Sequence, residues 1–173
     1  PSRTMLTVVS LLVLGAATPI RPDLLSGLVW RNVGPFRAGR ISAVSGVVGE
    51  PGTFYFGLPA GGVWKTTSAG ETWYPVFDAI TEVSSIGAVA VAPSKASVVY
   101  VGTGDQVTGG ATNEGNGVYK STDAGKNWTH MGLVGSKQIP SILVDPRNAD
   151  VVLVAAQGDL HAKSDARGVY RST

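Results

Sequence analysis

The stretch that decides the fold is Gly117-Val118-Tyr119-Lys120-Ser121-Thr122-Asp123-Ala124-Gly125-Lys126-Asn127-Trp128, which has the pattern of a strand followed by a tight turn. Its first six residues belong to a phrase that occurs three times in the 173-residue chain, at residues 62–67, 117–122 and 168–173. The copies are offset by 55 and then by 51 residues. A regular offset of this size indicates a repeat architecture in which each copy is one supersecondary unit.

Each repeat is predicted to contain four short strands. The first is an apolar run, at residues 41–48, 86–91 and 139–144, as expected for a strand buried on both faces. A turn at Pro51, Pro93 or Pro146 follows, because proline cannot continue a central strand. The second strand, at 53–56, 98–101 and 151–154, is rich in β-branched and aromatic residues. The third strand is the repeated phrase, and the fourth begins at Trp73 or Trp128. The pattern predicts an all-β array.

The turn between the third and fourth strands has a signature of its own. Residues 121–128 read S-x-D-x-G-x-x-W. The Asp123 carboxylate can accept hydrogen bonds from backbone N–H groups of the turn, and Gly125 can adopt the positive φ that other residues resist. Trp128 would then anchor the hairpin by burying a large ring. We expect Ser121, Asp123, Gly125 and Trp128 to stabilise structure rather than to act on a ligand.

The first copy of this turn, residues 66–73, differs at one decisive position. It keeps Thr66, Gly70 and Trp73 but carries Ser68 where the second copy has Asp123. A hydroxyl can take the same hydrogen bonds more weakly. The same structural role is therefore expected for the first copy.

At these residues the sequence resembles the Asp-box, or bacterial neuraminidase (BNR), repeat of sortilin-type β-propellers. That family includes exported bacterial proteins labelled glycosyl hydrolases. The resemblance covers roughly residues 30–173 and implies four-stranded antiparallel blades around an axis, with the Asp-boxes on the outer rim, away from the central ligand-binding face. The expected fold is a partial β-propeller of about two and three-quarter blades, at about residues 40–78, 84–134 and 138–173.

The blade count has a consequence for partners. Propellers typically have about 4–8 blades, so these blades cannot close a ring alone. We expect the chain to be the N-terminal part of a longer protein, whose remaining blades complete the fold. Completion by a partner chain or by self-association is the alternative. Residues 30–34, beginning at Trp30, have the pattern of a further strand that would complete the last blade.

The first residues have the pattern of a targeting segment. An apolar run at 5–14 follows Arg3 and precedes the small residues Gly15, Ala16 and Ala17, as in a signal peptide cleaved near Ala17. Even the 16 residues from 5 to 20 fall short of the ~20 that span a bilayer. We expect residues 1–17 to be a short apolar helix that serves as signal peptide or N-terminal anchor, 18–29 a linker, and 30–173 the propeller. The protein would be exported (periplasmic, cell-surface or extracellular), or membrane-anchored if the segment is uncleaved.

Composition excludes several classes of function. The chain has no Cys and two well-separated His, which leaves no basis for a thiol nucleophile, an iron–sulfur cluster or a His-based metal site. The 14 basic and 12 acidic residues are dispersed, so nothing marks a nucleic-acid surface. The glycine-rich loop at 102–116 fits neither nucleotide-binding pattern. No metal and no cofactor is implied.

Candidate site residues lie in the loops. Asp105 and Glu114 could form a glycosidase pair if separated by ~5–9 Å, with Asp159 as a third acid. Arg37 and Arg40 could aim guanidinium groups at a carboxylate or phosphate ligand. His161, beside Asp159, could relay protons near neutral pH. The alternative for all of them is an ordinary role on a solvated surface.

Three functions remain open at this point. Every well-defined motif is a turn, which favours a binding or assembly scaffold for a carbohydrate or protein ligand, without catalytic activity of its own. The resemblance alone favours the alternative, the N-terminal part of an exported glycoside hydrolase. A retained apolar segment would instead make the chain a membrane-anchored periplasmic subunit of a larger complex.

One structural expectation separates these functions. The repeated phrase places a valine row beside an aromatic row, and both are predicted to be buried between blades. The rows are Val63, Val118 and Val169, and Trp64, Tyr119 and Tyr170. An exposed aromatic row would instead favour carbohydrate binding.

Overall fold

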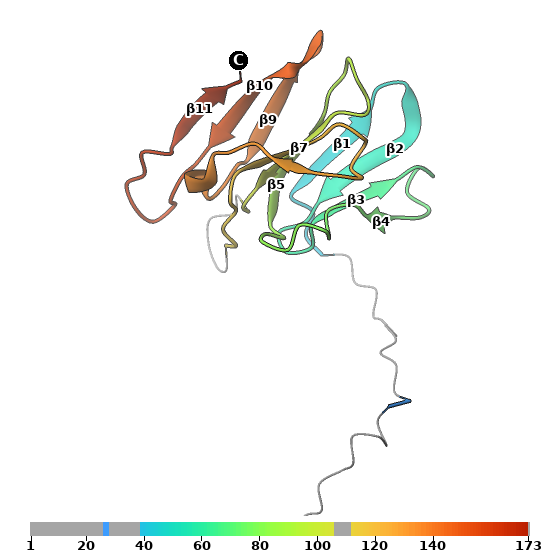
Figure 1. The fold of residues 1–173 in the computed structure, drawn as a ribbon, viewed down its shortest axis with the longest axis horizontal. Coiled ribbons are helices and arrows are strands. Elements are labelled where there is room, and N and C mark those ends of the chain that lie inside the picture. The colour runs from blue at the N-terminus through green and yellow to red at the C-terminus, as the bar shows by residue number, and fades with distance from the viewer. Residues whose placement is uncertain (1–25, 28–38, 106–111, 173) are drawn as a thin grey trace, which may run out of the picture. The chain divides into compact units, whose positions relative to one another are not determined.

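The computed structural model describes residues 26–27, 39–105 and 112–172 (Figure 1). The chain divides into two compact units, Pro1–Arg37 and Ala38–Thr173. Of the first unit only Ser26 and Gly27 are described, and they form a turn. The predicted apolar helix, the strand at residues 30–34 and Arg37 therefore lie outside the described residues. Within the described ranges, no helix has the length and hydropathy needed to cross a bilayer.

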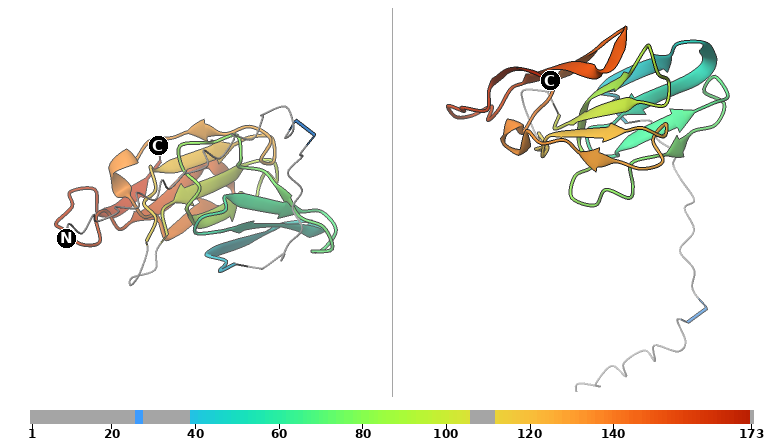
Figure 2. Two further views of the ribbon diagram at one scale, coloured as in Figure 1. Left: turned by 90° about the horizontal axis from the view of Figure 1, so that it is seen from below. Right: turned by 45° about the horizontal axis from the view of Figure 1, so that its top comes forward.

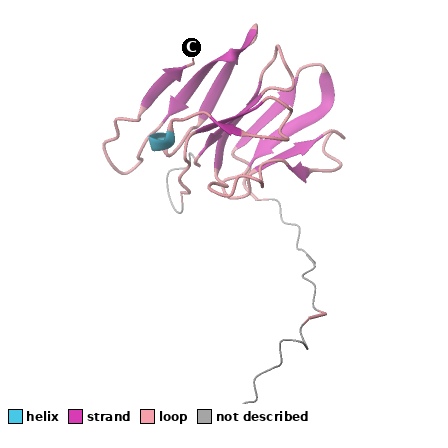
Figure 3. Ribbon diagram, viewed as in Figure 1, coloured by secondary structure: helices cyan, strands magenta, loops and turns pink. Residues whose placement is uncertain are grey.

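The second unit consists of three antiparallel sheets. Sheet A has the order β1-β2-β3-β4, with β1 (Ala43–Val47), β2 (Glu50–Gly57), β3 (Val63–Thr66) and β4 (Tyr74–Pro75). Sheet B has the order β5-β6-β7-β8, with β5 (Ile86–Val91), β6 (Val99–Thr103), β7 (Val118–Ser121) and β8 (Thr129–His130). Sheet C has the order β11-β10-β9, with β9 (Ser141–Asp145), β10 (Asn148–Ala156) and β11 (Gly168–Arg171). The only described helix is the single turn η2 (Val134–Ser136), drawn in cyan in Figure 3. The fold is all-β, a partial β-propeller.

The sheets stack face to face in chain order (Figure 2). Their first strands are adjacent, since β1 contacts β5 and β5 contacts β9. One buried cluster lies between sheets A and B and a second between sheets B and C. In β6, Val99 and Val101 belong to the first cluster and Tyr100 to the second. Burial on both faces is the reason why β5 and β6, the first two strands of sheet B, are almost continuously apolar.

The two interfaces repeat one steric fit. A Cβ placed on Gly57 of β2 would overlap Cγ2 of Ile86, the first residue of sheet B. A Cβ placed on Gly102 of β6 would overlap Cγ2 of Ile139 in the same way. Each glycine therefore leaves the room that the isoleucine of the following repeat occupies.

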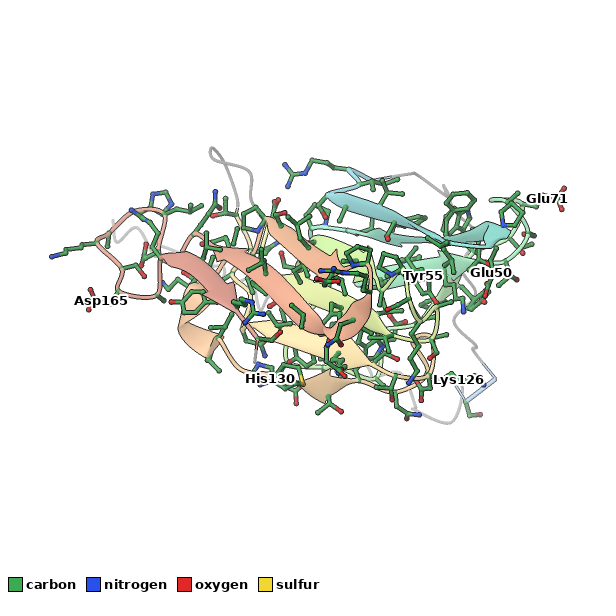
Figure 4. The ribbon with its side chains drawn as sticks, turned by 90° about the horizontal axis from the view of Figure 1, so that it is seen from above. Glu50, Tyr55, Glu71, Lys126, His130 and Asp165 are labelled. Carbon is green, nitrogen blue, oxygen red and sulfur yellow. The ribbon has the colours of Figure 1, made fainter. Side chains whose placement is uncertain are left out.

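The two interfaces also repeat a tyrosine–lysine pair. Tyr55 donates its hydroxyl to the carbonyl of Ala124 (3.1 Å), and Lys65 Nζ lies 5.2 Å from the Tyr55 ring centre. In the next interface, Tyr100 donates to the carbonyl of Ala149 (2.9 Å), and Lys120 Nζ lies 5.4 Å from its ring. Figure 4 labels Tyr55 between the strands of sheets A and B, and its burial is the main reason why its pKa is raised.

Two expectations need correction. The valine row is buried at Val63 and Val118, but Val169 is 76% exposed, because it lies on the face of sheet C that points away from sheet B. The first hairpin turn lies at Val48 and Gly49 rather than at Pro51. Pro51 lies near the start of β2, where the register between β1 and β2 is interrupted, a position that tolerates a proline without a backbone donor.

Candidate functional site

The candidate residues gather at one end of the sheets, here called the loop end. It comprises the segments that precede β1, β5 and β9 together with the loops β2–β3, β6–β7 and β10–β11, because the strands of each sheet are antiparallel. The opposite end holds the hairpin turns. Figure 4 shows Asp165 of the β10–β11 loop toward one end and Glu50 and Glu71 of sheet A toward the other.

The first cross-link at the loop end is an ion pair between Arg40 and Asp105. Arg40 precedes β1, whereas Asp105 follows β6, so the pair joins repeats 1 and 2. Asp105 is fully buried, and its backbone N–H donates to the carbonyl of Asn113 (3.1 Å). The Arg40 side chain is 47% exposed and borders an open hollow of about 420 Å³ with Gly39, Leu58, Pro59 and Ala60. A buried carboxylate held by a guanidinium is a structural tie between the two repeats.

The second cross-link is centred on Lys137, in the segment that precedes β9. Lys137 Nζ donates to Glu114 Oε1 (2.8 Å) and to Asp159 Oδ2 (2.9 Å). The hydrogen bond from Lys137 is the largest cause of the lowered pKa of Asp159, and the two carboxylates raise the pKa of Lys137. The acid of a glycosidase pair needs a raised pKa, so Asp159 is poorly suited to that role.

Neutral hydrogen bonds reinforce both cross-links. The Ser85 hydroxyl donates to the carbonyl of Asn113 (3.1 Å), and the Asn113 side-chain amide donates to the carbonyl of Pro59 (3.1 Å). On the other side, the Gly115 N–H donates to the carbonyl of Lys137 (2.6 Å). The described part of the β6–β7 loop is thus tied to the repeats before and after it.

The two histidines make simpler contacts. His161 is exposed, and it is its backbone N–H that donates to Asp159 Oδ1 (2.8 Å). His130 Nε2 lies 2.7 Å from the carbonyl oxygen of Asn116, and the ring packs edge-on against Tyr119. Neither contact places an imidazole against a nucleophile. No group of three or more His, Cys, Asp or Glu suited to a metal ion occurs among the residues that the structure describes.

The second turn (residues 121–128) is held by its serine and aspartate. Ser121 Oγ donates to Asp123 Oδ1 (2.8 Å) and accepts from the Gly125 N–H (2.8 Å). Asp123 Oδ1 also accepts from the Asn127 N–H (2.9 Å), and Oδ2 accepts from the Asn127 side-chain amide (2.7 Å). These bonds, chiefly those from Asn127, lower the pKa of Asp123 to about 2. Gly125 has φ +91°, in the left-handed region that glycine tolerates.

The first turn (residues 66–73) has the same backbone geometry with weaker acceptors. Thr66 Oγ1 accepts from the N–H groups of Ser68 and Gly70, each at 3.1 Å. Ser68 Oγ accepts from the Thr72 N–H (3.0 Å), the bond that Asp123 makes in the second turn. Gly70 has φ +97°. Trp73 packs on Phe56 of its own sheet, with ring centres 4.4 Å apart.

The sequence identified the acids of the loop end and Arg40, but not which residues pair with one another. Lys137 and Asn113 belong to no motif, and Lys137 lies 23 and 22 residues from the two acids that it binds. The aromatic row forms no exposed platform, because Tyr119 is only 5% exposed and Trp64 and Tyr170 are half-buried.

Comparison with known proteins supports the fold assignment. No protein-family model and no curated protein matches the chain. Among solved structures, the chain is similar to an ancestral GH74 enzyme (24% identity, TM-score 0.57, 76% of this chain and 15% of that chain). The chain is also similar to the GH74 enzyme of Niastella koreensis (24% identity, TM-score 0.54, 70% of this chain and 18% of that chain). A third similar structure is the GH74 xyloglucanase of Xanthomonas campestris (21% identity, TM-score 0.57, 76% of this chain and 19% of that chain).

These solved structures are β-propeller glycoside hydrolases, and the chain spans less than a fifth of the length of each. At such identities the likeness shows the fold. The fold is that of part of a GH74-like propeller.

Proposed function

We propose that this chain is a propeller segment that serves as a binding or assembly scaffold rather than as a hydrolytic centre. The proposal rests on the ion pairs that the three loop-end acids form. Asp105 is buried against Arg40, whereas Glu114 and Asp159 share Lys137. Arg40 connects repeats 1 and 2 through Asp105, and Lys137 connects Glu114 of repeat 2 to Asp159 of repeat 3. Each acid is thus held by a cation, which suits a rigid loop end better than proton transfer.

The alternative is that the chain is the N-terminal part of a glycoside hydrolase. The likeness of its fold to GH74 propellers favours this function. In that case the loop-end acids would act together with residues from further blades of a longer protein.

Polysaccharide turnover separates the two functions. Release of reducing sugar is measured for a panel that includes xyloglucan, with the wild-type chain and with Asp105→Asn, Glu114→Gln and Asp159→Asn. We expect no turnover above the buffer rate for any of the four proteins. Hydrolysis by the wild type that is lost in one of these variants would overturn the scaffold proposal in favour of the hydrolase.

A structural variant tests the role of the ion pairs at the loop end. Lys137→Met removes the cation that joins Glu114 to Asp159 while it keeps a side chain of similar length. Hydrogen exchange should become faster at residues 112–117 and 157–167 and stay unchanged in β5 and β6. Unchanged hydrogen exchange in both loops would contradict the idea that Lys137 holds them in place.

We further propose that the protein is exported, on the basis of the apolar run at residues 5–14. Sequencing the N-terminus of secreted or periplasmic protein should give a start near Thr18. Recovery of the intact chain in the membrane fraction would instead support a membrane-anchored periplasmic subunit.

A further inference from the structure

A pocket between sheets A and B, on the side away from β1 and β5, contains two lysines and encloses about 440 Å³. This volume is within the usual range of ligand-binding pockets. Lys65 of β3 and Tyr74 of β4 line it from sheet A, and Ala124 and Lys126 line it from the second turn. All four strands of each of these sheets are described, so both walls of the pocket belong to complete repeats.

Lys65 has no carboxylate partner among the described residues. Its side chain is half-buried, and Nζ donates to the carbonyl of Ala124 (3.3 Å) and lies beside the Tyr55 ring. An ammonium group has three N–H donors, and a cation that is partly removed from water is stable when a counter-charge is close. Lys126, which Figure 4 labels toward the end that holds Glu50, is exposed and forms no ion pair with a described residue either. The pocket therefore contains two cations to which an anion can bind.

The equivalent lysine in the next interface does have a carboxylate partner. Lys120 occupies the same position of the repeated phrase, and its Nζ donates to Asp150 Oδ1 (2.6 Å). Residues 88–102 and 141–155 align without a gap, which places Ser97 at the position of Asp150. Repeat 2 therefore gives the lysine of the first interface no carboxylate at the position from which repeat 3 gives one to Lys120.

The other groups of the pocket indicate which kind of anion fits. Asp78 also lines the pocket, so its two lysines and one acid leave an excess of one positive charge. This excess matches a single carboxylate better than a dianion. The Tyr74 side chain is 41% exposed and offers a flat apolar ring beside these charges. Asp78 is exposed and forms no ion pair with a described residue, so its carboxylate can accept hydrogen bonds from hydroxyl groups.

We propose that this pocket binds one uronate residue of an acidic polysaccharide. The ligand carboxylate accepts from Nζ of Lys65 and of Lys126, the sugar ring lies against Tyr74, and a sugar hydroxyl donates to Asp78. Hydrogen bonds between an ammonium group and a carboxylate are about twice as strong as neutral ones. This inference rests on the proposed scaffold function, because it names the class of ligand that the scaffold binds.

The test uses three probes: trigalacturonate, its full methyl ester and a triglutamate peptide. The amide NMR shifts of Gly125 and Lys126 report the binding of each probe to the 173-residue chain at constant ionic strength. We expect saturable binding of trigalacturonate and affinity about tenfold lower for the methyl ester, which keeps the sugar rings but lacks the charges. Equal affinities for these two probes would overturn the proposal. Triglutamate that binds as tightly as trigalacturonate would also overturn it, by assigning the pocket to acidic peptides.

Two variants remove the free lysine in different ways. Lys65→Met removes the cation, whereas Ser97→Asp supplies the carboxylate that repeat 2 lacks. The Ser97 carbonyl accepts from the Ala124 N–H (2.8 Å), so Ser97 lies next to the residue that Lys65 binds. Each variant should weaken the binding of trigalacturonate by about tenfold. Ser97→Asp keeps the contact of Lys65 with Tyr55, so it tests the pocket even if Lys65→Met fails to fold. Wild-type affinity in either variant, once a thermal melt shows that it is folded, would overturn the proposal.

Lys120→Met is the matched control, because Lys120 occupies the same phrase position but is already paired with Asp150. This variant should bind trigalacturonate as tightly as the wild type does. An equal loss of affinity in Lys120→Met and Lys65→Met would overturn the proposal by showing that only the overall charge matters. These experiments measure binding and not turnover, so a failure of this inference is distinct from a failure of the scaffold proposal.

Discussion

The interface between sheets A and B and the interface between sheets B and C use the same positions of the repeat but are filled to different degrees. Both contain a glycine opposite an isoleucine and a tyrosine that donates to a backbone carbonyl of the next repeat. In the first, Trp128 covers Val76 and Phe77, whereas in the second the described residues line a groove at the corresponding place. The comparison shows that the phrase positions fix the stacking of the sheets, whereas the fourth-strand tryptophan completes the packing.

The largest effect is expected for removal of the Tyr119 ring. This ring is buried and packs edge-on against Phe77, with centres 5.2 Å apart. Tyr119→Ala should reduce the free energy of unfolding by about 3–5 kcal/mol, the range for buried aromatic residues. Urea unfolding at equilibrium measures the loss.

Tyr170→Ala is the matched control, because Tyr170 occupies the same position beside the groove and is only half-buried. Tyr170→Ala should reduce the free energy of unfolding by less than half as much as Tyr119→Ala does. Equal losses would show that the two interfaces are packed alike and would break the comparison.

A smaller effect is expected where a methyl group is added at the shared glycine. Gly102→Ala should cost about 1–3 kcal/mol, because the new Cβ overlaps Ile139 and the sheets must separate locally. Sheet C carries Ala155 at the equivalent position. Combining Gly102→Ala with Ile139→Ala should cost less than the sum of the two single changes. If the loss of stability in the double variant equals the sum of the two single losses, Gly102 and Ile139 are not in contact.

The sequence predicted the fold well where burial has a simple pattern. The strand expected at residues 86–91 is β5 with the same bounds, because both of its faces are buried and its apolar run is uninterrupted. The strand expected at 151–154 is β10, which begins at Asn148 and ends at Ala156. Its first residue, Asn148, pairs with Asp145 at the end of β9, a contact that residue preference does not reveal.

The site was predictable only in part. Asp105, Glu114 and Asp159 are recognisable as loop acids, but the cations that hold Asp105 and Glu114 come from other repeats. Arg40 lies 65 residues from Asp105, and no local spacing connects the two. The long-range ion pairs at the loop end depend on how the sheets stack. The pairing partners therefore become apparent only in the folded structure.

The two turns extend the comparison to pH. The pKa of Asp123 is lowered from 3.8 to about 2 by its bonds to Asn127 and Ser121, whereas Ser68 in the first turn does not titrate. A lowered pKa stabilises the folded state above the unfolded value, and this contribution is lost as the pH falls from about 4 to about 2. The melting temperature of the wild type should therefore fall more steeply in this window than that of Asp123→Asn. If the melting temperatures of the two proteins fall in parallel with pH, ionised Asp123 does not stabilise the turn, since the other carboxylates titrate in both proteins.

The smallest effect, and the only stabilising one, is expected for Ser68→Asp. The Ser68 hydroxyl already accepts from the Thr72 N–H at 3.0 Å, so a carboxylate can take over this bond without a change of backbone. An anionic acceptor forms a stronger bond than a hydroxyl, and the gain should be a few tenths of a kcal/mol, because the turn is open to water. The gain should disappear when the pH is lowered to about 2, where the new carboxyl group is protonated.

Thermal melts at neutral pH and at low pH measure the effect, with Thr72→Asn as a second change that restores the Asp–Asn pair of the second turn. The double variant should be more stable than Ser68→Asp alone, because the Asn side-chain amide can donate to the free carboxylate oxygen as Asn127 does. If Ser68→Asp destabilises the protein at neutral pH, the two turns share a backbone shape without sharing the electrostatic environment that an aspartate needs.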